Sequence, residues 1–506
     1  MKRKPVPRPS PPPPAAAPPP AELIAMDEAI GQLKTTRNTF YRWLRSGRVK
    51  GMKVGRQWRF YRADIERFLK GEAPRIALAA DTAPLLAALA AQYKAVGAEG
   101  RFAAAGANPE EAIVKAVSAM IHLGFLLRAS DIHADVFEDT AVLSYRIDGV
   151  MREALRYDAR LHPAIVERWK TMANCDLHEK RLPQDGRIQV RAEADGQSTV
   201  LDLRVCFVPA LFGECVTARI LDKNAVRFTF DALPYSPTDR ERLAAALAAP
   251  YGLIICAGPT GSGKTTTLYA CLDRLNRPGK RLLSIEDPVE YAFPGVVQIP
   301  VNARAGAGGT FAGLLRATLR SDPDVIMVGE MREREALQIV LQAALTGHLV
   351  LTTLHAGAAC EALRRMVEIG AEPFLVGDAT RLIIAQRLVR RLCPHCSRPA
   401  KPAPELLAQA RTWALAGGLD WDRLARRWHT AKGCEQCRQT GYRGRLAIAE
   451  TLTVSPDLRR ALKEQAPVDA LEALAVRHGM TPMAADGVRR AAAAETTLDE
   501  IQRVIG

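Results

Sequence analysis

The stretch GPTGSGKTTT, from Gly258 to Thr267, has residue types and spacing that suit the phosphates of a nucleotide. It fits the pattern G-x-x-x-x-G-K-[ST], in which backbone N–H groups surround phosphate oxygens and glycines let the main chain approach them closely. We predict that Lys264 reaches the β and γ phosphates of ATP and that the Thr265 hydroxyl ligates Mg²⁺. The predicted nucleotide-binding set is Gly258, Pro259, Thr260, Gly261, Ser262, Gly263, Lys264, Thr265 and Thr266.

The segments on either side of this stretch have the patterns that a phosphate loop requires. Residues 251–257 are short, apolar and followed by Gly-Pro, which predicts a buried strand. The apolar spacing of TTTLYACLDRL predicts a helix that begins near Lys264 and directs its positive end at the anion. The alternative, a Gly/Ser turn that matches the pattern by chance, does not account for both flanks.

Two acidic residues each follow an apolar run further along the chain. LLSIE ends at Glu286 and VIMVGE ends at Glu330, so each run is predicted to be a strand with an acid at its carboxyl end. Open α/β sheets bind their ligands at that end, where a carboxylate can orient water or the surroundings of Mg²⁺. A helix cap or a salt bridge is the alternative role for each acid.

Two Cys-x-x-Cys pairs offer four thiolates for a metal ion. This spacing suits a tetrahedral structural Zn²⁺, and we predict that the segment between the pairs forms a metal-stabilised subdomain. Two redox-active dithiols are the alternative. The predicted zinc ligands are Cys393, Cys396, Cys434 and Cys437.

Length and composition exclude several classes of protein. The chain has 506 residues, which is enough for three or more units, and 48% hydrophobic content is ample for buried cores. The Pro-rich start of the chain lacks the apolar segment of a signal peptide, and no run of about 20 uncharged apolar residues predicts a membrane span. We therefore expect a cytoplasmic protein without direct membrane insertion, which reaches the inner membrane only through partners.

The net charge of +15 is concentrated near the N-terminus, because residues 34–62 contain ten Lys or Arg and no Asp or Glu. The pattern there predicts a short helix, a second helix capped by Thr36, a hairpin that turns near Gly55 and a closing helix. The stretch TFYRWLRSGRVKGMKVGRQWRF resembles the winged helix-turn-helix of excisionase and mercury-resistance-type regulators.

That resemblance implies binding of duplex DNA. Its major groove would be contacted by Arg37, Asn38, Tyr41 and Arg42, and phosphates or the minor groove by Arg56 and Arg59. The alternative is a protein-docking module whose arginines are solvated or face an acidic protein.

Six further stretches share a likeness to one family. They are ASDIHADVFED, RLPQDGRI and RVCFVPALFGECVTARIL before the phosphate loop, and LLSIEDPVEY, LRSDPDVIMVGEMRE and LTGHLVLTTLHA after it. Together they resemble the ATPases of type II secretion and type IV pilus assembly, the secretion traffic ATPases, and the likeness runs from near Asn108 to the end of the chain. The cysteine pairs, followed by GYRGRLAIAE, are typical of the assembly ATPases rather than of the pilus retraction ATPases.

The resemblance also implies roles for individual residues. Glu330 would polarise the attacking water, and Glu286 or Asp287 would assist Mg²⁺ because the residue before Glu330 is glycine rather than the usual aspartate. His348 and His355 match the histidine box, where a neutral imidazole could sense the γ-phosphate; a structural histidine is the alternative. The positions from which the family sends arginines toward phosphates, often those of an adjacent subunit, are Arg181, Arg187, Arg204 and Arg219, for which surface cations are the alternative.

The predicted fold is α/β, with a RecA-like P-loop ATPase core, a mixed α+β N-terminal domain, a zinc-binding subdomain and a small winged helix-turn-helix domain. The predicted boundaries are a Pro-rich tail at 1–22, the winged helix-turn-helix at 23–71, an Ala/Gly/Pro-rich linker at 72–108, the middle domain at 109–232, the ATPase domain at 233–392, the tetracysteine subdomain at 393–443 and a C-terminal helical region at 444–506.

We interpret the chain as a homo-hexameric ATPase that uses ATP, Mg²⁺ and Zn²⁺. It would power assembly of a type II secretion pseudopilus or a type IV pilus through an inner-membrane platform protein. The alternative function is that of a DNA-binding ATPase acting in DNA processing, uptake or transcriptional regulation. A scaffold that does not hydrolyse ATP is disfavoured by the intact loop and by Glu330.

Overall fold

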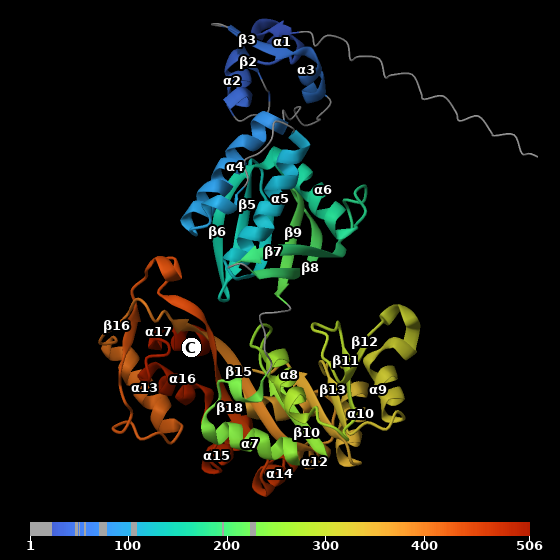
Figure 1. Ribbon diagram of the computed structural model, residues 1–506, viewed down its shortest axis with the longest axis vertical. Coiled ribbons are helices and arrows are strands. Elements are labelled where there is room, and N and C mark those ends of the chain that lie inside the picture. The colour runs from blue at the N-terminus through green and yellow to red at the C-terminus, as the bar shows by residue number, and fades with distance from the viewer. Residues whose placement is uncertain are drawn as a thin grey trace, which may run out of the picture. The chain divides into compact units, whose positions relative to one another are not determined.

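The computed structural model describes residues 23–45, 49, 51–54, 57–69, 78–102, 109–194, 197–222 and 229–506 (Figure 1). The predicted Pro-rich tail and the predicted DNA contact Arg56 lie outside these residues. The chain separates into two compact units, the first formed mainly by residues before 221 and the second mainly by residues after it. Within the part of the chain that is described, no helix is both long enough and apolar enough to span a bilayer.

The first unit begins with a small domain of three helices and a three-stranded sheet of order β1-β3-β2. Phe40 and Phe60 are fully buried, and their rings meet edge to face with centroids 5.0 Å apart. Thr36 caps the second helix, as predicted, because its hydroxyl accepts a hydrogen bond from Thr39 N at 3.3 Å. The predicted helix pair, hairpin and closing helix are confirmed, and β1 is an additional strand. The elements are β1 (Leu23–Ala25), α1 (Met26–Gln32), α2 (Arg37–Arg45), β2 (Met52–Val54), β3 (Gln57–Tyr61) and α3 (Arg62–Leu69).

The sequence predicts a linker with short Ala-rich helical pieces at 72–108, and helix α4 (Leu78–Ala95) lies in this stretch. Leu85, Leu89 and Tyr93 are spaced by four residues and are buried, and the Tyr93 hydroxyl donates to Ala119 O of the following helix at 3.1 Å. This part of the predicted linker is therefore packed structure. The sequence gives no sign of this packing, because alanines dominate both faces of the helix and its buried face carries little contrast in polarity.

A six-stranded sheet of order β6-β5-β4-β9-β8-β7 forms the middle domain, with α5 against β4 and α6 against α5 (Figure 1). The mixed α+β organisation predicted for this domain is confirmed, and the stretch ASDIHADV forms strand β4. The elements are α5 (Pro109–Leu126), β4 (Ala129–Val136), β5 (Thr140–Ile147), β6 (Val150–Asp158), α6 (His162–Ala173), β7 (Gln184–Ala194), β8 (Gln197–Ala210) and β9 (Gly213–Asp222).

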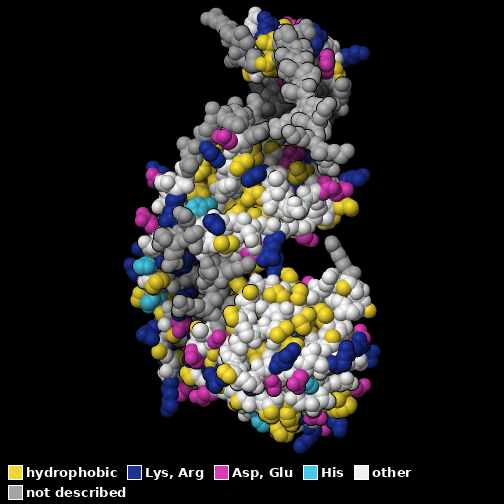
Figure 2. All heavy atoms as spheres, turned by 45° about the vertical axis from the view of Figure 1, so that its right-hand side comes forward, with side chains coloured by type: hydrophobic (Ala, Val, Ile, Leu, Met, Phe, Trp, Pro, Cys, Tyr) yellow, Lys and Arg dark blue, Asp and Glu magenta, His cyan; other side chains and the backbone are white. Residues whose placement is uncertain are grey.

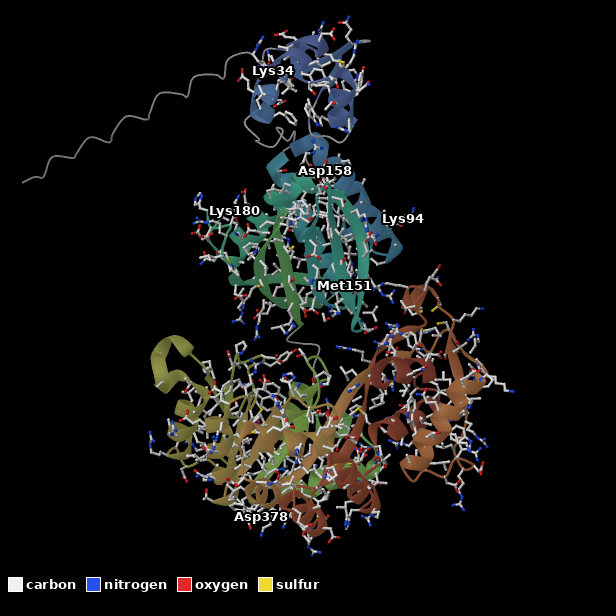
Figure 3. All side chains as sticks on the ribbon, turned by 180° about the vertical axis from the view of Figure 1, so that it is seen from behind. Lys34, Lys94, Met151, Asp158, Lys180 and Asp378 are labelled. Atoms are coloured by element: carbon white, nitrogen blue, oxygen red, sulfur yellow. The ribbon has the colours of Figure 1, made fainter. Side chains whose placement is uncertain are left out.

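A buried ion pair ties α6 to this sheet. Lys170 Nζ lies 2.6 Å from Glu214 Oε1, and the two side chains are 0% and 8% exposed. The same ammonium donates to Glu179 O at 2.6 Å, which fixes the loop that continues through Lys180 (labelled in Figure 3) to Arg181. Removal of one partner would leave an uncompensated buried charge. Truncation of either side chain is therefore expected to lower the free energy of unfolding by about 3–5 kcal/mol.

The second unit is built on a seven-stranded sheet of order β12-β11-β13-β14-β10-β15-β18. The strand pairings are parallel except that of β15 with β18. The strands are β10 (Gly252–Ala257), β11 (Leu282–Glu286), β12 (Val296–Pro300), β13 (Val325–Val328), β14 (Leu349–Leu354), β15 (Thr380–Leu392) and β18 (Tyr442–Thr453).

Helices cover both faces of this sheet, as the RecA-like fold predicts (Figure 1). Leu253 and Ile255 of β10 belong to a core that includes α10, whereas Ile254 and Cys256 belong to the core that includes α7 and α8. The helices around the sheet are α7 (Pro237–Ala248), α8 (Lys264–Leu275), α9 (Phe311–Leu319), α10 (Arg334–Leu345), α11 (Ala359–Ile369) and α12 (Pro373–Ala379).

The C-terminal part continues from β15 into the cysteine-bearing segment and a group of helices. The segment between the cysteine pairs contains a helix, and the rings of Trp421 and Trp428 lie 6.2 Å apart in this segment. The elements are β16 (Ser397–Pro399), α13 (Pro404–Ala416), β17 (His429–Ala431), α14 (Pro456–Lys463), α15 (Val468–Arg477), α16 (Met483–Ala492) and α17 (Leu498–Ile505).

Candidate functional site

Four strands bring their carboxyl ends to one edge of the seven-stranded sheet. Ala257 of β10 pairs with Leu354 of β14, and Val328 of β13 pairs both with Thr352 of β14 and with Ile285 of β11. The segments that follow these strands are therefore neighbours, although they are far apart in sequence. This is the edge at which open α/β sheets bind ligands.

The loop after β10 has the backbone of a phosphate-binding loop. Gly263 has φ 89° and directly precedes α8, so a residue that tolerates positive φ turns the chain into the helix. Lys264 Nζ donates to Gly258 O at 2.8 Å and to Pro259 O at 3.0 Å, so its ammonium lies within the curve of the loop. Burial lowers the pKa of Lys264, although the carboxylate of Glu330 opposes this effect.

Glu330 is held by two cationic or basic side chains. Its two oxygens contact Arg332 Nη2 at 2.6 Å and His355 Nε2 at 2.9 Å, and its side chain is 19% exposed. Burial alone would raise the pKa of Glu330, but the hydrogen bond from Arg332 and the charges of His355 and Lys264 hold the pKa below its usual value. The residue is therefore a carboxylate at neutral pH and can accept a hydrogen bond from water.

Glu286 lies at the same edge but is engaged in an internal network. Its carboxylate accepts hydrogen bonds from Tyr269 at 2.6 Å, from Ser284 at 2.5 Å and from Gln298 at 3.2 Å, and the residue is 4% exposed. Both oxygens therefore have protein donors. This arrangement suits support of the turn that follows β11 better than direct ligation of Mg²⁺.

The structure separates the two histidines that the sequence placed in one motif. His355 follows the carboxyl end of β14 and contacts Glu330. His348 precedes the amino end of that strand, where its Nδ1 lies 3.2 Å from Ala343 O and its carbonyl accepts a hydrogen bond from Gly252 N at 3.0 Å. Because β14 spans the sheet, His348 lies at the opposite edge from the phosphate loop and is not brought to this site.

Three of the four predicted arginines share one face of the middle-domain sheet. They alternate along neighbouring strands with buried apolar residues, so their side chains point away from the buried face. Arg219 contacts Asp131 at 3.2 Å, and Arg181 lies in the loop before β7 with a side chain that is 90% exposed. The three that share the face are Arg187 of β7, Arg204 of β8 and Arg219 of β9.

The four predicted zinc ligands converge. Their sulfur atoms lie within 4.8 Å of one another, and the pairs Cys393–Cys434, Cys396–Cys437 and Cys434–Cys437 are 3.9, 3.7 and 3.7 Å apart. Four sulfurs at about 2.3 Å from a tetrahedral Zn²⁺ would lie about 3.8 Å from each other, so the cluster fits this ion.

Backbone N–H groups favour the thiolate form of one cysteine in this cluster, the form that binds a metal ion. Burial alone would raise the pKa of Cys437, but N–H groups of Cys434 and Gly441, at 3.2 and 3.1 Å from its sulfur, lower this pKa to about 6. Burial raises the pKa of Cys396 to about 12. A bound dication favours the thiolate form of every ligand, so metal binding releases protons.

The small N-terminal domain presents four of the six predicted DNA contacts on one helix. In α2, Arg37, Asn38, Tyr41 and Arg42 are exposed, whereas Phe40 of the same helix is buried. Figure 2 shows Lys and Arg side chains projecting from this domain, and Lys34, labelled in Figure 3, lies in the turn before α2. Arg59 lies on β3, where its Nη2 donates to Gln57 at 3.0 Å.

Sequence reasoning missed two residues at the nucleotide edge. Arg332 follows Glu330 by two residues, and only its proximity to a strand-end acid could have singled it out. Gln386 lies under the phosphate loop and follows the apolar run LIIA of the strand, where a polar residue next to a buried run is the available signal.

Comparison with known proteins is consistent with this geometry. Residues 107–503 match the family model described as "Type II/IV secretion system protein", and residues 27–73 match one described as "Helix-turn-helix domain". The putative type II secretion system protein E of Escherichia coli K12 is 41% identical over 392 residues, which cover 78% of this chain and 76% of that protein. The type IV pilus assembly ATPase PilB of Myxococcus xanthus is 40% identical over 398 residues, covering 78% and 68%.

A solved structure supports the fold. The ATPase DotB of Legionella pneumophila superposes with a TM-score of 0.54 at 19% identity, over 76% of this chain and 94% of that one. At this identity the likeness concerns the fold alone.

We expect that the protein purified under reducing conditions carries one zinc ion per chain and that Cys434→Ser loses it. Zinc binding by four thiolates is worth on the order of 10 kcal/mol in small zinc units, so the variant should also unfold its subdomain at lower denaturant concentration. Elemental analysis and hydrogen exchange of β16, β17 and the segment between them measure the two effects. Cys360→Ser, a buried cysteine outside the cluster, should retain zinc; an equal loss in both variants would contradict the assignment.

Proposed function

The chain belongs to the family of type II/IV secretion system proteins, and on this premise we propose that its ATP hydrolysis powers assembly of a type II secretion pseudopilus or a type IV pilus. The observation that carries the proposal is the meeting of Lys264, Glu330 and His355 at one sheet edge, beside a phosphate loop. The cysteine cluster and the arginine-bearing middle domain accompany this ATPase in the same chain.

Catalysis would proceed by positioning and charge stabilisation. Loop N–H groups and Lys264 would hold the β and γ phosphates, while Glu330 accepts a hydrogen bond from the attacking water and orients it in line with the γ-phosphate. Arg332 and His355 fix the two carboxylate oxygens, which limits the directions from which that water can approach. Mg²⁺, when bound by the Thr265 hydroxyl, would neutralise charge on the phosphate oxygens.

The arginines of the middle domain would complete this site across a subunit boundary. A planar guanidinium that approaches the γ oxygens stabilises the charge that develops during phosphoryl transfer. Arg187, Arg204 and Arg219 support this proposal because they share one face of the sheet. The proposed assembly is a cytoplasmic homo-hexamer that acts on an inner-membrane platform protein.

Glu330→Gln is expected to bind ATP as tightly as the wild type but to hydrolyse it about 100-fold or more slowly, because the amide is a poorer acceptor for the attacking water. Lys264→Ala is expected to lose nucleotide binding. Titration calorimetry with ADP and a phosphate-release assay separate the two effects. Glu368→Gln, an exposed acid paired with Arg365 at 3.4 Å, is the matched control, and wild-type turnover by Glu330→Gln would remove that residue from the mechanism.

The assembly function itself is tested in the source organism. Replacement of the chromosomal copy by the Lys264→Ala form should stop secretion or filament assembly, while the Glu368→Gln form supports both. Normal secretion and normal filaments in the Lys264→Ala strain would contradict the proposed function even if the purified protein hydrolyses ATP.

Action in trans predicts complementation between inactive chains. Rings assembled from Arg187→Ala and Lys264→Ala subunits should recover part of the ATPase activity, because some interfaces pair an intact arginine with an intact loop. Turnover measured over a series of mixing ratios gives the result. Arg156→Ala alters an exposed arginine of β6 that is already bonded to Glu153 at 2.7 Å, so it should retain activity by itself. Mixtures as inactive as their parents would argue against action in trans.

We propose a second function for the N-terminal domain, the binding of duplex DNA through α2. The observation that favours it is the exposed row of Arg37, Asn38, Tyr41 and Arg42 in a segment that matches a helix-turn-helix model. A recognition helix places such side chains on base edges and phosphates of the major groove. In a hexamer, six copies would raise the apparent affinity through effective concentration.

The full chain is expected to bind duplex DNA with an affinity that falls steeply with salt, and removal of residues 1–71 should abolish binding while leaving basal ATPase activity intact. The double variant Arg37→Ala, Arg42→Ala should weaken binding by about 1–3 kcal/mol for each arginine replaced. Arg62→Gln is the control, because Arg62 is already neutralised by Glu28 at 2.6 Å. Fluorescence anisotropy over a range of salt concentrations is the measurement, and absence of binding at low salt would leave the domain as a protein-docking module.

A further inference from the structure

A buried polar side chain follows the apolar run LIIA of β15, beneath the phosphate loop. Gln386 is 2% exposed, and its neighbours Ile384 and Ala385 are fully buried. A buried amide is costly unless its donor and acceptor both have partners. Both do: Nε2 donates to Ser262 O of the loop at 2.7 Å, and Oε1 accepts from hydroxyl groups.

Those hydroxyl groups determine which end of the amide faces the loop. Thr267 Oγ1 donates to Gln386 Oε1 at 3.0 Å, and the Tyr235 hydroxyl donates to the same oxygen. The two hydroxyls also contact each other at 2.7 Å, and both residues are buried. With its oxygen occupied in this way, Gln386 can present only its NH₂ group to the loop.

The bond to Ser262 O sets the direction of a loop N–H. A trans peptide is planar, so the carbonyl of Ser262 and the N–H of Gly263 point in opposite directions. When Gln386 holds this carbonyl toward β15, the Gly263 N–H points away from the strand. Contact is close, because a Cβ added at Gly263 would lie 3.1 Å from Gln386 Nε2, and one added at Gly258 would lie 2.5 Å from Gln386 O.

We propose that Gln386 is a positioning residue for nucleotide binding. It holds the Ser262–Gly263 peptide in the orientation that directs the Gly263 N–H to a phosphate oxygen, and Tyr235 and Thr267 hold Gln386 in turn. The inference rests on the phosphate loop being the nucleotide site. It adds a residue of a distant strand, which contacts the loop rather than the nucleotide, to the determinants of phosphate affinity.

Replacement of Gln386 by glutamate gives a readout that a purely structural role would not produce. A protonated carboxyl group can donate to Ser262 O as the amide does, whereas the ionised form can only accept. Because burial raises the pKa of a carboxyl group, this titration falls near neutral pH. The affinity of full-length Gln386→Glu for ADP should therefore be close to that of the wild type at low pH and fall progressively between about pH 6 and about pH 9, measured relative to wild type at each pH.

Two further variants measure, at fixed pH, how much the hydrogen bonds of Gln386 contribute to ADP affinity. Gln386→Leu should weaken ADP binding about tenfold, because the hydrogen bond to Ser262 O is lost and the loop is no longer held in one orientation. Tyr235→Phe should weaken it about threefold, because Thr267 still holds the amide. Tyr145→Phe is the matched control, because it removes another buried hydroxyl, which donates to Met120 O at 2.8 Å in the middle domain. This variant should not change the affinity for ADP.

The outcomes separate this inference from the proposed function. If the wild type fails to bind ADP in titration calorimetry, the nucleotide site itself is wrong. If the wild type binds ADP and Gln386→Glu shows the same pH profile as the wild type, Gln386 does not position the loop. An equal loss of affinity in Tyr235→Phe and Tyr145→Phe would likewise overturn the proposal, since it would reflect general destabilisation.

Discussion

The parallel register of four neighbouring strands is the constraint on which the nucleotide site depends. Each strand delivers one function as it leaves the sheet: the phosphate loop after β10, Glu286 at the end of β11, Glu330 after β13 and His355 after β14. A shift of one residue in any pairing would move a functional side chain by about 3.3 Å along the edge and would turn alternate residues to the opposite face. The apolar residues of β10, which pack alternately on two separate cores, resist such a shift.

Charge at this edge is arranged to favour a polyphosphate. Arg332 and His355 contact the carboxylate of Glu330, whose pKa the charge of Lys264 also lowers, while the nearby Glu286 accepts hydrogen bonds from uncharged donors. Cations around one acid lower the pKa of that acid and leave the pocket attractive to anions. In the proposed mechanism, the same acid would hold water for attack without repelling the nucleotide as strongly as an isolated carboxylate would.

Features encoded locally could be predicted from the sequence, whereas features that depend on pairing between distant strands could not. The phosphate loop, the four cysteines and the two strand-end acids follow from short-range patterns, and the structure brings the members of each set together. The histidine pair shows the limit of such patterns. Their spacing brackets a strand of six residues, which is about 20 Å long, so only His355 reaches the site. Gln386 was invisible for the opposite reason, because its role comes from β15 lying beside β10.

The segment that follows His355 links this edge to the C-terminal helices. Glu361 accepts hydrogen bonds from Gly357 N and Ala358 N at 2.9 and 3.1 Å, and Glu450 of β18 accepts one from Ala359 N at 2.6 Å. Burial raises the pKa of Glu450, and backbone N–H groups partly offset that effect.

Glu450 also accepts a hydrogen bond from Met483 N, at the start of α16, at 3.0 Å. One buried carboxylate thus joins the amino ends of α11 and α16. Because neither helix can shift alone without leaving an oxygen or an N–H group unpaired, a displacement of the chain after His355 is resisted unless α16 moves with it. The nucleotide edge and the C-terminal helices are therefore mechanically connected through hydrogen bonds as well as through the sheet.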